Sequence, residues 1–154
     1  MAEVTDLWSP AIVRLNPAGE NLLAVIDTLS DAAVAEGLLK AEQRDIAITA
    51  VLRREMSGST VMPEGIAFPH GRTSAVSEQC VVLGVFTDGK GFSDKNCPVP
   101  VWLVVLVFAP LSTAGASHIQ LLANLCRRLM GTGVVEQLRA ATNSKDVLNV
   151  LRGS

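Results

Sequence analysis

Apolar residues recur with a helical period along two stretches near the start of the chain. Between Pro17 and Gly37, leucine, valine and isoleucine return at intervals of three and four residues, which predicts a helix with one apolar face. A second helix is predicted over residues 41–56, because that stretch ends in charged residues just before Gly58. Further helices are predicted over residues 117–130, 134–141 and 144–152.

The middle of the chain carries short apolar runs of the kind found in buried strands. Strands are predicted over residues 65–68, 79–86 and 101–108, and turn residues such as Asp88-Gly89 and Cys97-Pro98 follow or precede them. Their near-continuous valine and leucine content, with amphipathic helices before and after them, implies a sheet that is covered on both faces. The pattern therefore predicts an α/β fold.

Composition narrows the class of protein further. A chain of 154 residues with 49% hydrophobic and 18% charged residues is expected to form one globular domain over residues 1–152. Residues 153–154 are set aside as a tail that is either native or left over from cloning. A net charge of -2 does not suggest the basic surface that nucleic-acid-binding proteins need.

The longest apolar run is too short to insert into a membrane. It covers residues 99–111 and is interrupted by two prolines, whereas a bilayer crossing needs about 20 apolar residues. The start of the chain lacks the basic and apolar pattern of a signal peptide. Three cysteines without a C-x-x-C pair suit a reducing compartment, so we expect a cytoplasmic protein.

The chain has only two histidines, and one of them stands in an unusual setting. In Phe68-Pro69-His70-Gly71-Arg72, the proline favours an extended backbone before it, so the strand over residues 65–68 should stop just before the imidazole. Gly71 would let the backbone pass close to a group on the ring, and Arg72 would supply a cation for an anion. The alternative is a loop histidine without a role.

The segment around His70 has a wider pattern. From Arg54 to Gly71 the chain reads REMSGSTVMPEGIAFPHG, which resembles the signature of the mannitol/fructose-type (type 2) enzyme IIA domains of the bacterial phosphotransferase system. The Arg-Glu opening, the Gly-Ser-Thr step and the close at Pro-His-Gly match, while Pro63 replaces a small residue and Phe68 an aliphatic one. The resemblance covers nearly the whole chain and implies a three-layer α/β/α sandwich around a mixed sheet.

The second histidine, His118, is predicted to begin a helix. Ser117 and Gln120 have the spacing of a capping box, which puts His118 at a helix N-terminus where unpaired N–H groups favour an anion. The resemblance implies that it meets His70 in a shallow surface depression. Alternatively, His118 belongs to the apolar stripe of that helix.

Other candidates for phosphate contacts lie before the His70 strand. Arg54 stands 16 positions before His70, the spacing at which the family keeps an active-site arginine, and its planar fork of donors suits phosphate oxygens. The alternative is an exposed arginine that interacts with a helix C-terminus, as Arg53 would. Ser59 and Thr60 would add hydroxyl donors or merely open a strand.

The resemblance implies a phosphoryl carrier. His70 would accept a phosphoryl group from the phosphocarrier HPr and pass it to an enzyme IIB, with His118 and Arg54 assisting and with no cofactor or metal. A regulatory protein of the nitrogen type, which signals its phosphorylation state by binding a target protein, is the alternative. A zinc site joining the two histidines and a hydrolase are weaker alternatives, because neither a ligand cluster nor a catalytic motif accompanies the histidines in sequence.

Overall fold

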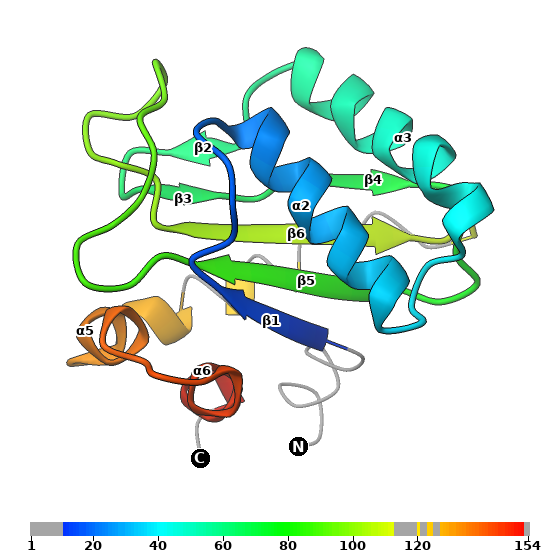
Figure 1. Ribbon diagram of the computed structural model, residues 1–154. Helices are drawn as coiled ribbons and strands as arrows, with labels where there is room; N and C mark the ends of the chain where they lie inside the picture. The colour runs from blue at the N-terminus through cyan, green and yellow to red at the C-terminus, as the bar shows by residue number, and fades with distance from the viewer. Residues whose placement is uncertain (1–10, 113–119, 121–122, 125–126, 153–154) are drawn as a thin grey trace.

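A single mixed β-sheet forms the centre of the molecule. The computed structural model describes residues 11–112, 120, 123–124 and 127–152. The strands follow the order β1-β5-β6-β3-β2, and β4 also pairs with β6 (Figure 1). The pairs β1–β5, β3–β6 and β4–β6 are parallel, and the pairs β2–β3 and β5–β6 are antiparallel. The strands are β1 (Ala11–Leu15), β2 (Val61–Met62), β3 (Ile66–Ala67), β4 (His70–Arg72), β5 (Cys80–Val85) and β6 (Leu103–Ala109).

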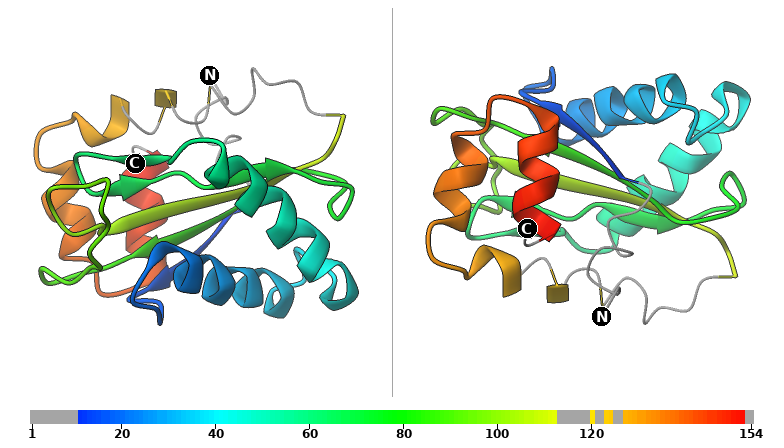
Figure 2. Two further views of the ribbon diagram at one scale, coloured as in Figure 1. Left: turned by 90° about the horizontal axis from the view of Figure 1, so that it is seen from above. Right: turned by 90° about the horizontal axis from the view of Figure 1, so that it is seen from below.

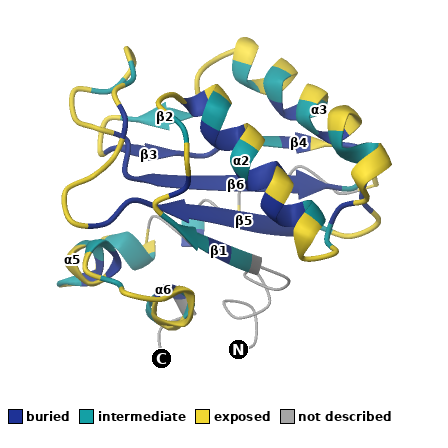
Figure 3. Ribbon diagram, viewed as in Figure 1, coloured by how far each residue is buried: buried dark blue, intermediate teal, exposed yellow. Residues whose placement is uncertain are grey.

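The two central strands are buried along their whole length. All six residues of β5 and all seven of β6 lie in the core, as Figure 3 shows. Both faces of these strands need apolar side chains, because layers of helix cover the sheet on either side. The strands predicted over residues 79–86 and 101–108 are confirmed.

Two helices cover one face of the sheet. They are α2 (Leu22–Ala35) and α3 (Arg44–Met56), which is preceded by the short 3-10 helix η1 (Ala41–Gln43) (Figures 1 and 2). Asn21 caps α2, because its side-chain oxygen accepts a hydrogen bond from the backbone N–H of Ala24 at 2.8 Å. The two helices predicted near the start of the chain are confirmed.

The end of the chain closes the opposite side of the sheet. Helical residues 123–124 and 127–129 lie on the face away from α2, and α6 (Ser144–Arg152) lies along the β1 edge (Figure 2). Ser144 ties α6 to that edge by donating its hydroxyl to the carbonyl of Val13 at 3.0 Å. Between them runs α5 (Val134–Arg139), shorter than predicted. The three-layer sandwich around a mixed sheet, in a single domain, is thus confirmed.

Three short strands were not predicted. β1 pairs with β5, while β2 and β4 have only two and three residues, so their sequences carry too few alternations to reveal a strand. The predicted start of a helix at Ser117 lies outside the described residues. Among the helices that the structure describes, none is long and apolar enough to cross a bilayer.

Candidate active site

His70 opens a strand that continues an earlier one. β3 pairs Ile66 with Leu103, and β4 pairs His70 with Val107, so both strands keep the same offset against β6. Pro69 breaks the line because it has no N–H to donate, although its carbonyl still accepts from the N–H of Val107 at 3.0 Å. The prediction that the strand stops before the imidazole is therefore wrong in part: the strand is interrupted at Phe68-Pro69 and resumes at His70.

The neighbour of His70 is packed against a helix. A Cβ atom on Gly71 would lie 2.9 Å from the backbone carbonyl carbon of Ala50 and from the backbone nitrogen of Val51, both in α3. Glycine at position 71 therefore lets β4 approach α3, while our prediction that it lets the backbone approach a group on the ring stays a prediction. Because side chains alternate along a strand, His70 and Arg72 project from the opposite face of the sheet.

The imidazole is held by the carbonyl of Phe68. Nδ1 of the half-buried His70 lies 2.9 Å from that oxygen, and the buried Phe68 ring lies 5.3 Å from the imidazole, tilted by 53°. A carbonyl oxygen can only accept, so Nδ1 must carry the proton. In the neutral ring, the lone pair is then on Nε2.

Ser59 and Thr60 are joined to the same segment. The hydroxyl and the N–H of Thr60 donate to the two carboxylate oxygens of Glu55 at 2.6 and 2.9 Å, and its carbonyl accepts from the N–H of Phe68 at 3.3 Å. The Ser59 hydroxyl accepts from the N–H of Val61 at 3.1 Å. Sequence reasoning gave Glu55 no role, although it belongs to the Arg-Glu opening of the matched segment.

Arg54 lies in the last turn of α3, next to Glu55. Its guanidinium is exposed and donates from Nη1 to the carbonyl of Gly58 at 2.7 Å, just beyond the helix end. The structure brings the Arg54 segment to the His70 strand through the contacts of Glu55, Thr60 and Phe68. A role for Arg54 at the phosphoryl group stays a prediction.

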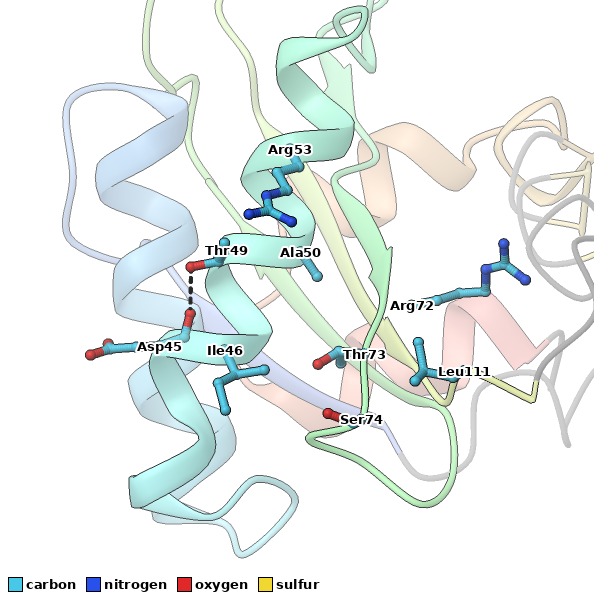
Figure 4. Close-up of a pocket in the computed structure, with 9 residues that line it drawn as sticks. All are labelled: Asp45, Ile46, Thr49, Ala50, Arg53, Arg72, Thr73, Ser74 and Leu111. Atoms are coloured by element: carbon cyan, nitrogen blue, oxygen red, sulfur yellow. Dashed lines mark hydrogen bonds between the residues drawn. The ribbon is translucent and has the colours of Figure 1, made fainter.

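A separate depression lies on the α3 side of β4. Figure 4 shows its lining, which encloses about 420 Å³ and includes Arg53, Arg72, Thr73 and Leu111 but not His70. The Arg72 side chain extends away from α3 in this view, whereas Arg53 lies over the helix. The depression is therefore behind the strand that bears His70, not in front of the imidazole.

His118 lies outside the described residues, so its predicted meeting with His70 stays a prediction. Within the ranges that the structure describes, no group of three histidine, cysteine or acidic side chains is placed to hold a metal ion. Cys80 is buried in β5, and burial chiefly raises the pKa of its thiol, to about 11. Cys97 is half-buried and its Sγ lies 3.2 Å from the carbonyl oxygen of Met62.

The comparison with protein families identifies the chain. The family model of the phosphoenolpyruvate-dependent sugar phosphotransferase system, EIIA 2, matches residues 7–154. The chain belongs to this family. The resemblance stated from the segment around His70 is confirmed, and both the sugar-specific and the nitrogen-regulatory branches occur among the relatives of this enzyme IIA protein.

Two relatives match along nearly their whole length. The PTS system fructose-specific EIIA component of Haloferax volcanii is 35% identical over 151 residues, which are 98% of this chain and 96% of that protein. The nitrogen regulatory protein of Bradyrhizobium diazoefficiens is 30% identical over 152 residues, and the match covers 96% of this chain and 94% of that protein.

Other relatives are much longer than this enzyme IIA chain. It is 30% identical to the PTS system 2-O-alpha-mannosyl-D-glycerate-specific EIIABC component of Escherichia coli, but covers only 23% of that protein. Among solved structures, the complex of enzyme IIAMTL and phosphorylated enzyme IIBMTL from Escherichia coli has a TM-score of 0.71 at 24% identity, covering 92% of this chain and 94% of that one. That likeness supports the fold.

Proposed function

We propose that this enzyme IIA protein is a phosphoryl carrier of a sugar phosphotransferase system. It accepts a phosphoryl group on His70 from an HPr-like phosphocarrier and passes it to an enzyme IIB. The observation that carries the proposal is the 2.9 Å contact between Nδ1 of His70 and the carbonyl of Phe68, which leaves Nε2 as the nucleophilic nitrogen. Membership of the EIIA 2 family supports a role in phosphoryl transfer.

The transfer step requires little covalent chemistry from the protein. The Nε2 lone pair of His70 forms a bond to phosphorus while the phosphorus–nitrogen bond of the donor phosphohistidine breaks, and the donor imidazole keeps that electron pair. The Nδ1 proton stays on His70 and points at the Phe68 carbonyl, whose negative end favours the positive charge that the phosphorylated ring carries. In the second step, an enzyme IIB nucleophile takes the phosphoryl group and the lone pair returns to Nε2.

Arginine and histidine side chains around the ring would stabilise the negative charge of a phosphoryl group on His70. Arg72 shares the sheet face of His70, and a phosphoryl group there would attract its guanidinium. Arg54 would reach the phosphoryl group by exchanging its contact with Gly58 for a phosphate oxygen. His118, at the predicted helix start, would donate to phosphoryl oxygens without being the acceptor.

A regulatory role is the second candidate. Its support is the nitrogen regulatory protein of Bradyrhizobium diazoefficiens, which matches nearly the whole of both chains. In that case His70 is still phosphorylated, but the readout is binding of a target protein. A phosphoryl group adds about two negative charges, enough to reverse the local potential of a docking surface.

The test is labelling with phosphoenolpyruvate, enzyme I and HPr, read by mass spectrometry. We expect one acid-labile phosphoryl group in the wild type and none in His70→Ala. His118→Ala should still be labelled, but about 10- to 1000-fold more slowly if one donor to the transition state is lost. A label that survives in His70→Ala, or a wild type that no cognate carrier labels, would contradict the proposal.

The two roles are separated by adding partners to the labelled protein. Transfer of the label to a cysteine or histidine of an enzyme IIB from the same source supports the carrier. A stable complex with a non-transport protein, formed in only one phosphorylation state and without transfer, would instead support regulation.

A further inference from the structure

We propose that Glu55 is a positioning residue for His70. It draws the N–H of Thr60 out of the β-ladder, and so leaves the carbonyl of Phe68 to orient the imidazole. The inference deepens the proposed function and rests on His70 being the phosphoryl acceptor. It adds a residue that touches neither the imidazole nor the phosphoryl group but decides which ring nitrogen holds the proton.

The pairing of β2 and β3 predicts a partner for the Phe68 carbonyl that the structure does not use. Val61 lies opposite Ala67 and Met62 opposite Ile66, so the next pair outward is Thr60 with Phe68. In an antiparallel ladder, every second pair exchanges two hydrogen bonds, one in each direction. The N–H of Phe68 donates to the carbonyl of Thr60 at 3.3 Å, so Thr60 and Phe68 form one of these hydrogen-bonded pairs.

The second bond of that pair is replaced by two others. The N–H of Thr60, which the ladder would direct at the Phe68 carbonyl, donates to Oε2 of Glu55 at 2.9 Å. The Phe68 carbonyl accepts instead from Nδ1 of His70, also at 2.9 Å. Because the Glu55 carboxylate takes the N–H of Thr60, the Phe68 carbonyl bonds to the His70 imidazole where the ladder would have given it a bond from Thr60.

The Phe68 carbonyl is directed away from the other neighbouring strand. The carbonyls of Gly65 and Pro69 accept from β6, at 2.8 Å from Trp102 N–H and 3.0 Å from Val107 N–H. Because successive carbonyls along a strand alternate in direction, the Phe68 carbonyl points to the β2 side. Glu55 therefore controls the ladder N–H that would compete for it.

Glu55 is fixed by hydrogen bonds at both of its carboxylate oxygens. Its second carboxylate oxygen accepts from the Thr60 hydroxyl at 2.6 Å, so both oxygens bind one residue, and the side chain is half-buried. Without an acceptor at position 55, the Thr60 N–H is expected to close the ladder with Phe68. The Phe68 carbonyl would then accept from both the Thr60 N–H and the Nδ1–H of His70, which weakens the bond that favours the Nδ1–H tautomer.

The experiment measures the tautomer and the rate separately. We expect ¹⁵N NMR of the unphosphorylated wild type to show His70 protonated at Nδ1 in the neutral ring. In Glu55→Ala the two tautomers should mix, and the kcat of phosphoryl transfer from HPr should fall about 10- to 100-fold, the cost of a misplaced nucleophile. The KM for HPr should stay unchanged, since Glu55 does not contact the phosphoryl group.

Two further variants make the test specific. Glu55→Gln keeps an oxygen that can accept from the Thr60 N–H, so it should restore the tautomer and most of the rate. Glu36→Ala removes a carboxylate at the end of the other helix, where it pairs with Arg14 at 2.9 Å, and should leave both readouts at their wild-type values. If Glu55→Ala does not fold, Glu55→Met replaces it, because methionine is long and helix-forming but lacks an oxygen.

The results distinguish this inference from the proposed function. An unchanged tautomer and rate in Glu55→Ala would overturn the inference, as would a loss in Glu55→Gln as large as in Glu55→Ala. A wild type that accepts no phosphoryl group would overturn the proposed function, while the NMR experiment would still decide whether Glu55 sets the His70 tautomer.

Discussion

Strand β6 and the interrupted line of β3 and β4 lie side by side in one register, yet they have different roles. Every residue of β6 is buried, and β6 pairs with β5 on its other side. The neighbouring line is broken at Phe68-Pro69 and is half-exposed at His70. His70, the proposed phosphoryl acceptor, lies where the ladder is incomplete and where the carbonyl of Phe68 accepts a hydrogen bond from its imidazole.

The largest effect on stability is expected in β6. Leu106 is fully buried opposite Val82, so Leu106→Ala should reduce the free energy of unfolding by about 2–5 kcal/mol, measured by urea denaturation. Leu111→Ala makes the same change at a side chain that is 62% exposed, and should stay within about 0.5 kcal/mol of the wild type. The folded fraction of Leu106→Ala should still be labelled at His70. If the folded fraction of Leu106→Ala were labelled as poorly as variants at the site, the contrast between β6 and the interrupted β3–β4 strand would be lost.

A smaller effect is expected where β4 meets α3. The Cβ of Gly71→Ala would lie 2.9 Å from two backbone atoms that cannot rotate away, so β4 or α3 must shift, at a cost of about 1–3 kcal/mol. Unlike Leu106→Ala, this variant should also slow labelling in the folded protein, since β4 carries His70. Arg72→Ala, at the exposed next residue, serves as the control for stability and should change it by about 0.5 kcal/mol or less. Wild-type stability in Gly71→Ala would show that the contact between β4 and α3 is looser than described.

The last effect appears only at alkaline pH and concerns Cys80, whose thiol is buried in β5. Burial raises the pKa of its thiol from 9.0 to about 11, so the unfolded chain loses this proton at a lower pH than the folded chain. The protonated Cys80 thiol contributes fully to stability below pH 9. As the pH rises from 9 to about 11, the free energy of unfolding falls by at most about 1.4 kcal/mol per pH unit. Urea denaturation at several pH values should show this slope in the wild type and lack it in Cys80→Ala. Equal slopes would indicate that the thiol is more hydrated than its position in β5 implies.

Most of the fold was predictable because long periodic segments carry their own signal. The first helix follows from its apolar spacing, the second from its charged end before Gly58, and the strands β5 and β6 from near-continuous apolar runs. β1, β2 and β4 were missed because a few residues cannot establish a period, and their strand geometry comes from pairing with distant segments.

The candidate site was predictable in its residues but not in its contacts. The motif pointed to His70, Arg54, Ser59 and Thr60, yet nothing in the sequence connects Glu55 to the imidazole. That connection depends on a ladder pair between Thr60 and Phe68, which exists only after the hairpin has formed. Likewise, the reason for glycine at position 71 lies in α3, about 20 residues earlier in the chain.

The shared register of β3 and β4 limits how this segment can vary in length. His70 lies an even number of residues after Ile66, so both side chains project from the same face of the sheet. One residue inserted or deleted between Ala67 and His70 would turn the imidazole toward α3, into the space that only a glycine now occupies. A change of residue type at position 68 leaves its carbonyl in place. Evolution can therefore substitute side chains between these strands, but alignments of functional relatives should contain no gap there.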